Sequence, residues 1–409
     1  MTGFALKMDS ICRGLAAFGL AVLVACTAAA QDLAVQADTL HTGAGAPIAD
    51  GVVWIEEGRI RAVGPASAID LPDDLERIRV PVATPGLIDA RSTVGLSGAM
   101  NQPHDQDQLE RSAAIQPELR AIDAYNPRER LVDWLREHGI TTLHTGHGPG
   151  ELISGQTLIA KTRGGTIDEA VMVPSFGLSA TLGPGATGHD RSSPGNRSKA
   201  VAMLRARLIE AEAHAEREEA SRDLALDALV EVLDGTRPLV VHADHHVDIL
   251  AALRLAEEFG FRLILASASD AHLLVDEIRA AGVPVLLHPP MIRAWGGSER
   301  ANFSFTTART LLDAGIPVAL QSGFEGYVPK TRVVLFEAGL LLGYGLDVDE
   351  ALSLITTAPA EILGIADRVG TLEVGKHGDV ALFDGNPFEY TTHVLGTVIE
   401  GVRVSEVRR

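Results

Sequence analysis

Cysteine is almost absent from this sequence. It has two cysteines in 409 residues, Cys12 and Cys26, and both lie within the first thirty residues. The chain beyond residue 30 therefore has no thiol, which excludes disulfide bridges and thiol catalysis there. Basic residues are also few, because 35 Lys and Arg stand against 54 Asp and Glu, giving a formal net charge of -19. Such a chain repels phosphate backbones and anionic lipids, so we expect no nucleic-acid partner.

The sequence also lacks internal repeats and low-complexity tracts. Hydrophobic residues make up 46% and charged residues 22% of the chain, which is ordinary for a globular protein. This composition excludes a chain that is disordered, collagen-like or coiled-coil throughout. At this length a single core nears its upper size, so we expect one large domain and one smaller domain.

In the first thirty residues, basic, apolar and small residues follow one another in the order typical of an export signal. Two basic residues precede an apolar run, residues 14–25, that is too short for a permanent membrane helix, and small residues follow. Ala28 and Ala30 fit the small-x-small rule for cleavage before residue 31. We therefore expect residues 1–30 to be a signal peptide and the mature protein to be periplasmic or otherwise exported.

Two alternatives to cleavage before residue 31 stay open. Residues 23–26 read Leu-Val-Ala-Cys, which resembles the lipobox of bacterial lipoproteins, and lipid on Cys26 would then anchor the protein to a membrane. The segment could also be a buried N-terminal helix of a cytosolic protein, although the order of its zones favours export.

Beyond the leader the hydrophobic pattern changes twice. Residues 33–83 form short alternating strands with turns between them, and the same pattern returns after residue 368. We expect the two ends to form one discontinuous β-sandwich domain, residues 31–83 and 369–409. Between them, short apolar strands alternate with helices, which predicts a parallel (β/α)8 or TIM barrel over residues 84–368. The eight predicted barrel strands are 80–88, 141–145, 157–161, 176–181, 239–242, 263–266, 283–287 and 318–321.

Three segments resemble the amidohydrolase superfamily, and in particular its exported imidazolonepropionase-like branch. Residues 85–89 read Pro-Gly-Leu-Ile-Asp, residues 358–364 read Ala-Pro-Ala-Glu-Ile-Leu-Gly, and residues 370–379 fit Gly-x-Leu-x-x-Gly-Lys-x-x-Asp. The resemblance spans essentially the whole chain beyond the leader. It implies a TIM-barrel hydrolase of carbon-nitrogen bonds, acting on amides or small peptides, with one or two divalent ions such as zinc.

The positions that hold metal ligands in that superfamily carry other residues here. The resemblance implies His-x-His after strand one, a carboxylated Lys on strand four, His on strands five and six, and Asp on strand eight. In this sequence those positions are held by Arg91 and Thr93, Ser179, His242, Ser267 and Gly323. Only His242 is retained, so we expect a degenerate metal site.

Arg91 also argues against a metal on electrostatic grounds. A guanidinium about 4 Å from a dication, at an effective dielectric near 20, is repelled by roughly 8 kcal/mol. That repulsion cancels much of the roughly 10–16 kcal/mol that a tight zinc site provides. We therefore expect no cofactor, although zinc is what the resemblance implies.

Two functions of different classes remain open. In an altered hydrolase, Arg91 polarises a carbonyl or holds a carboxylate, while His242, Asp89 or Glu325 acts as the base. In the alternative, a pseudoenzyme binds a small molecule or peptide, or supports an active paralogue, without turnover. Assembly of this chain into an oligomer, with copies of itself or with that paralogue, also remains open.

Loops at the predicted barrel mouth supply further candidates. We expect Trp295, His288, His245 and Tyr327 to contact a substrate, against the alternative that they only pack or solvate their loops. Residues 242–246 read His-Ala-Asp-His-His, which could hold one ion together with Glu325, or could be a polar loop with one inward His242. Glu325 could instead form a salt bridge with Arg91 that fills the empty cavity.

Overall fold

The two ends of the chain build one small β unit. The computed structural model describes residues 32–188, 193–217, 221–291, 302–324 and 332–409, so the predicted signal peptide lies outside the described residues. Seven strands pair in the order β16-β15-β14-β4-β1-β2-β3. Their bounds are β1 (Leu33–Leu40), β2 (Ile48–Glu56), β3 (Arg59–Pro65), β4 (Glu76–Pro85), β14 (Val380–Phe383), β15 (Val394–Ile399) and β16 (Val402–Ser405).

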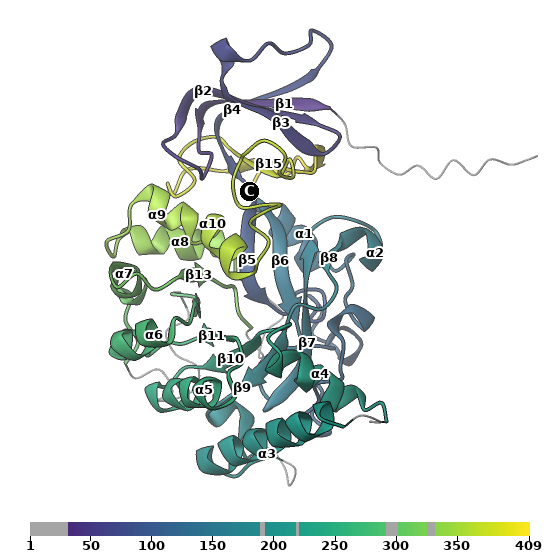
Figure 1. The fold of residues 1–409 in the computed structure, drawn as a ribbon. Helices are drawn as coiled ribbons and strands as arrows, with labels where there is room; N and C mark the ends of the chain where they lie inside the picture. Colours follow the sequence, from purple (N-terminus) through teal and green to yellow (C-terminus); the bar gives the residue numbers. More distant parts are fainter. Residues whose placement is uncertain (1–31, 189–192, 218–220, 292–301, 325–331) are drawn as a thin grey trace, which may run out of the picture.

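The antiparallel pair β4 and β14 joins the two halves of this sheet. Alternate side chains from both halves, such as Val35, Ile55 and Leu382, are buried in one shared hydrophobic core. The prediction that both chain ends form one separate β unit is confirmed, with the predicted sandwich present as a single seven-stranded sheet. Figure 1 shows this unit above the barrel.

Eight further strands form the barrel. Their order is β5 (Leu87–Ser92), β6 (Ile140–Gly146), β7 (Ile153–Lys161), β9 (Leu178–Thr181), β10 (Leu239–Ala243), β11 (Leu263–Ser267), β12 (Val285–Leu287) and β13 (Val318–Leu320), with β8 (Val171–Val173) paired beside β7. A bridge between Ser92 and Gly323 closes the ring. The predicted α/β barrel is confirmed.

The first predicted strand is divided in the structure. Residues 80–88 were expected to form one barrel strand, but β4 ends at Pro85 in the small sheet and β5 begins at Leu87 in the barrel. Gly86 separates them, and a Cβ there would come within 2.3 Å of the Thr141 hydroxyl oxygen. The close approach of β6 therefore requires a glycine at the break.

One barrel strand runs against the others, so the prediction of a fully parallel barrel is wrong for β7. This strand pairs antiparallel with both β6 and β9. A short loop, residues 147–152, joins β6 to β7, and such a connection can only link antiparallel neighbours. The amino end of β7 consequently lies at the barrel mouth. Its carboxyl end, Lys161, lies at the base and pairs there with Asp379 beside the small sheet.

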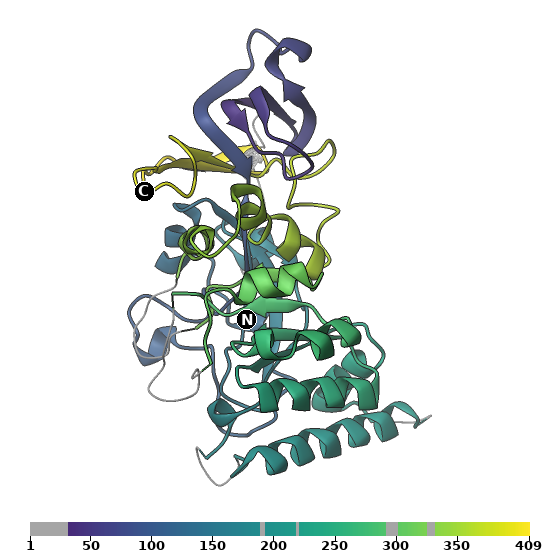
Figure 2. The ribbon, with the colours of Figure 1, turned by 90° about the vertical axis from the view of Figure 1, so that its left-hand side faces the viewer.

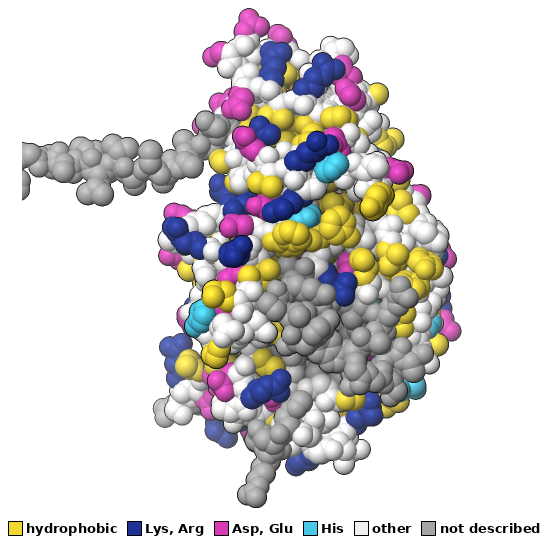
Figure 3. All heavy atoms as spheres, turned by 180° about the vertical axis from the view of Figure 1, so that it is seen from behind, with side chains coloured by type: hydrophobic (Ala, Val, Ile, Leu, Met, Phe, Trp, Pro, Cys, Tyr) yellow, Lys and Arg dark blue, Asp and Glu magenta, His cyan; other side chains and the backbone are white. Residues whose placement is uncertain are grey.

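Helices cover the outside of the barrel (Figures 1 and 2). They are α1 (Arg130–Arg136), α2 (Ile167–Ala170), α3 (Arg197–Ala215), α4 (Leu224–Leu233), α5 (His246–Phe259), α6 (Val275–Ala281), α7 (Thr307–Asp313), α8 (Val334–Leu342), α9 (Val348–Ser353) and α10 (Thr357–Ile362). Within the described ranges, no helix has both the length and the apolarity needed to cross a bilayer. On the face drawn in Figure 3, basic side chains are interspersed with acidic ones.

Candidate active site at the barrel centre

A small pocket opens where the barrel strands end. Its wall includes the six residues at positions where the family resemblance implies metal ligands, which lie on β5, β9, β10 and β11 and in the turns after β5 and β13. The structure therefore brings all six together around one cavity, as the geometry of a barrel mouth favours. These residues are Arg91, Thr93, Ser179, His242, Ser267 and Gly323.

Arg91 provides the positive charge of the pocket. Its side chain is only 5% exposed, and its guanidinium donates hydrogen bonds to the backbone carbonyls of Ser92 and His147. A third bond runs to the Ser179 hydroxyl oxygen at 3.1 Å. Burial lowers the pKa of Arg91 to about 10, and the nearby Asp89 carboxylate opposes that shift. The guanidinium is therefore charged at neutral pH.

Asp89 lies two residues earlier on β5 and is fully buried. Its Oδ1 accepts hydrogen bonds from the backbone N–H of Ser322 at 2.9 Å and of Arg91 at 3.3 Å. Burial raises the pKa of Asp89 to about 6, although these bonds and the charge of Arg91 act in the other direction. Asp89 was a candidate base, but it is not among the residues that line the pocket. It instead ties β5 to the turn after β13.

Two buried histidines beside Arg91 were not predicted as site residues. His144 lies on β6, with Nδ1 2.7 Å from the Ala90 carbonyl oxygen and Nε2 2.8 Å from the Thr157 hydroxyl. Burial, and then the charge of Arg91, lower the pKa of His144 to about 3 and that of His147 to about 4. Both rings are therefore neutral at pH 7, and they add no second cation beside Arg91. The signal available in the sequence was that His144 lies on a predicted barrel strand and His147 directly after it.

His242 on β10 supplies the imidazole of the pocket. Its Nε2 lies 3.5 Å from Oδ2 of Asp244. The other oxygen of Asp244 accepts hydrogen bonds from the Ser267 and Ser269 hydroxyls, each at 2.5 Å. The two serines hold Asp244 in place, with its other oxygen next to the His242 ring. Histidine is the side chain that most often acts as a general base in enzymes.

The turn that carries these serines has an unusual backbone. Ser267 and Ala268 have φ angles of 69° and 50°, which lie in the left-handed region that non-glycine residues rarely adopt. The Ala268 N–H donates to the Ala243 carbonyl at 3.1 Å, and this bond holds the strained turn against β10. Strain of this kind is found most often at functional sites.

None of the four predicted substrate contacts is among the described residues that line this pocket. His288 is buried in a second cavity, where its ring lies 4.9 Å from that of Phe303, centroid to centroid. His245 caps the start of α5 and lines a third cavity together with His242 and Asp244. The remaining predicted residues, Trp295, Glu325 and Tyr327, lie outside the described residues.

Comparisons with known proteins agree with this architecture. The profile of the amidohydrolase family matches residues 168–405, more than half of the chain. Imidazolonepropionase from Rhizobium rhizogenes is 26% identical over 371 residues, covering 82% of this chain and 87% of that protein. Imidazolonepropionase from Geobacillus kaustophilus is 28% identical over 399 residues, covering 87% of this chain and 90% of that protein.

A solved structure shows the same fold. The amidohydrolase from Thermotoga maritima superposes with a TM-score of 0.86 at 24% sequence identity, covering 92% of this chain and all of the other. The motifs in residues 85–89, 358–364 and 370–379 therefore predicted the family correctly. This chain belongs to the amidohydrolase family.

Proposed function

We propose that this chain keeps the substrate pocket of the amidohydrolase barrel and acts on carbon-nitrogen compounds there without the metal pair implied by the family. The observation that carries the proposal is the position of Arg91. Its buried guanidinium lines the same cavity as the residues at all the other ligand positions. In this proposal, a fixed cation takes the place that the family resemblance implies for metal ions.

The residues around the pocket do not fit a zinc pair. Among the described residues that line it, His242 is the one side chain of a type that zinc prefers, and there is no carboxylate or thiolate. Even a catalytic zinc usually has three protein ligands. The charge of Arg91 adds a repulsion of several kcal/mol for any dication at this place. Ser267, at another ligand position, donates its hydroxyl to Asp244.

The same residues can assist hydrolysis in another way. A guanidinium has five N–H donors, and three hydrogen bonds from Arg91 to protein oxygens are present. A remaining donor can bond to the carbonyl oxygen of an amide and stabilise the negative charge that forms there. His242, next to Asp244, takes a proton from the attacking water and returns it to the departing amine. The products are a carboxylate and an amine.

The hydrogen bonds of Arg91 also favour a second candidate function, which is binding without turnover. They hold the guanidinium against protein oxygens, so that Arg91 fills the cavity as a structural cation. A barrel of this kind would bind a carboxylate-bearing small molecule or peptide, or would support an active paralogue. In both proposals the ligand is small and the partner is not a nucleic acid. Contact with a membrane would depend on lipid at Cys26.

A hydrolysis screen in the presence of chelator tests the proposal. Dipeptides and N-acyl amino acids are the substrates, and the wild type is compared with His242→Asn and with a control at the exposed His104, His104→Ala. We expect turnover that survives chelator and falls by about 10²- to 10⁴-fold in His242→Asn only. Turnover that chelator abolishes and added zinc restores would contradict a metal-free mechanism. Binding without turnover, weakened in Arg91→Met, would establish the second candidate.

A further inference from the structure

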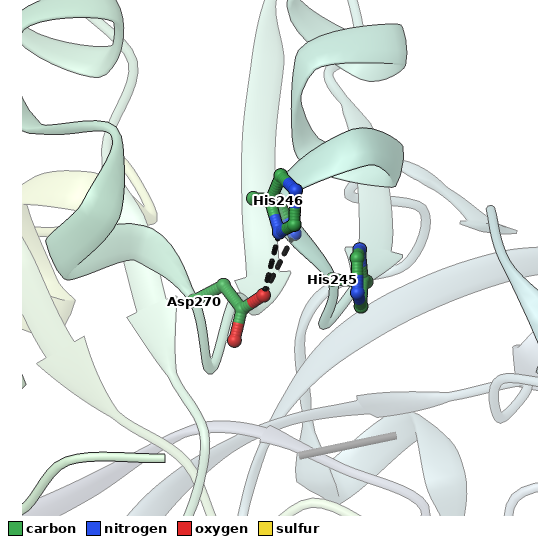
Figure 4. A group of neighbouring side chains, drawn as sticks. All are labelled: His245, His246 and Asp270. Carbon is green, nitrogen blue, oxygen red and sulfur yellow. Dashed lines mark hydrogen bonds and ion pairs between the residues drawn. The ribbon is translucent and has the colours of Figure 1, made fainter. Parts of the chain in front are cut away.

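Two histidines and a carboxylate meet at the rim of the barrel, outside the Arg91 pocket. His245 and His246 stand at the start of α5, directly after β10, and Asp270 follows β11 (Figure 4). One donor atom from each of the three side chains lies within 4.8 Å of the other two. Imidazole nitrogen and carboxylate oxygen are ligands that zinc and similar divalent ions prefer.

Asp270 is the buried member of this rim cluster. Its Oδ2 accepts a hydrogen bond from the His246 backbone N–H at 3.0 Å and another from the Asn302 side chain at 3.1 Å. Its Oδ1 is also buried and has no hydrogen-bond partner among the described residues. A buried carboxylate oxygen without a partner is costly unless a cation or donor approaches it. A cation bound by Oδ2 would offset the cost of burying this carboxylate, while Oδ1 points away from His246 in Figure 4.

The two imidazoles are placed to complete such a site. His246 Nδ1 lies 3.1 Å from Asp270 Oδ2, which is close to the separation of two ligands on one ion with bonds of about 2.0–2.2 Å. The rings of His245 and His246 lie side by side, with centroids 4.2 Å apart and planes inclined by 32°. The His246 side chain is 39% exposed, so an ion can enter from solvent. Figure 4 shows His246 directed at the Asp270 carboxylate, with His245 beside it.

We propose that His245, His246 and Asp270 bind one zinc-type divalent cation at the rim of the barrel. Three protein ligands leave a fourth tetrahedral position for water or for a group of a bound ligand. The ion would also neutralise the buried charge of Asp270. This rim site uses neither Arg91 nor His242 as a ligand, although His245 lines a cavity together with His242.

Titration with zinc chloride tests this site. The full chain is stripped of metal with chelator, dialysed and titrated in a calorimeter. Four proteins are compared: wild type, His245→Ala, His246→Ala and the control His272→Ala. His272 lies two residues after Asp270 and contacts Thr307 instead of the rim cluster. We expect one zinc per chain for the wild type and the control, and an affinity at least about tenfold lower for each rim variant. Cobalt should give visible absorption bands in the wild type that His245→Ala loses.

The results of this zinc titration distinguish an ion at the rim site from an ion in the Arg91 pocket. Equal zinc affinity in the wild type and both rim variants would overturn the proposal, as would the absence of zinc binding by folded wild type. Zinc that is kept in both rim variants but lost in His242→Ala would place the ion in the Arg91 pocket. That result would overturn both the rim site and the metal-free pocket. Circular dichroism establishes that each variant is folded, and Asp270→Asn provides a variant that removes the charge but keeps the shape.

Discussion

At the scale of single residues, Arg91 is held by its own surroundings. The carbonyls of Ser92 and His147 and the hydroxyl of Ser179 accept hydrogen bonds from its guanidinium inside the barrel. Removing the guanidinium leaves these buried acceptors without a donor, and each unsatisfied buried group costs about 1–3 kcal/mol. Loss of the buried charge offsets part of that cost.

We therefore expect Arg91→Met to lower the free energy of unfolding by about 2–4 kcal/mol, measured by urea denaturation. The matched control is Arg279→Met, which removes a guanidinium that is 57% exposed and should change stability by less than about 0.5 kcal/mol. Equal stability of Arg91→Met and wild type would show that the guanidinium is not part of the structural framework.

The sequence predicted part of this site and missed the rest for physical reasons. The six residues at the ligand positions were chosen from the family resemblance, and the structure brings them together because the carboxyl ends of barrel strands converge. His144 and His147 were missed because their burial depends on the hairpin between β6 and β7, which no local pattern specified. Asp270 was missed because its approach to His246 depends on how the turn after β11 folds.

At the scale of elements, the reversed strand β7 connects the barrel to the small sheet. Its last residue, Lys161, is 2% exposed and pairs with Asp379, which is 4% exposed and directly precedes β14. Asp379 also accepts a hydrogen bond from the Glu400 backbone N–H at 3.0 Å, and this bond fixes the carboxylate.

The positions of the barrel strands were predictable from apolar runs in the sequence. The direction of β7 was not, because a buried apolar run has the same pattern in both directions.

Breaking this buried pair on one side should be costly. We expect Lys161→Met to lower the free energy of unfolding by about 3–5 kcal/mol, because the Asp379 carboxylate is then buried without its cation. In the double variant Lys161→Met/Asp379→Asn, most of that loss should be recovered. A double-mutant cycle by urea denaturation measures the coupling, and additive effects of the two substitutions would argue against the pair.

At the scale of the whole molecule, the buried titratable groups predict a pH dependence of stability. His144 and His147 have pKa values lowered from 6.5 to about 3 and about 4, so the unfolded chain binds their protons first as the pH falls. Each of them makes the fold less stable below about pH 6.5, by up to about 1.4 kcal/mol per pH unit. The raised pKa of Asp89, about 6 against 3.8, acts in the opposite direction between about pH 6 and 4.

Replacing one of these histidines should flatten the profile. We expect His147→Phe to reduce the slope of unfolding free energy against pH by about 1.4 kcal/mol per unit between about pH 6 and 4.5. Urea denaturation at several pH values gives both slopes, and the exposed His104→Ala serves as the control. An unchanged slope in His147→Phe would mean that His147 titrates alike in the folded and unfolded chains.

The order of zones in the first thirty residues predicts where the whole chain acts. We propose export and cleavage before Gln31, so the mature protein recovered from a bacterial periplasm should begin at that residue when its intact mass is measured. A mass that starts at Cys26 with added acyl groups would show membrane anchoring instead. Recovery of the uncleaved chain from the cytosol would contradict export.

The zinc content of the pocket tests the central claim most directly. The double variant His245→Ala/His246→Ala removes the rim ligands, so any remaining tightly bound zinc must lie elsewhere. We predict far less than one zinc per chain when this variant is purified without chelator and analysed by mass spectrometry of its metals. One or two zinc ions per chain, lost on adding His242→Ala, would contradict the replacement of the metal centre by Arg91.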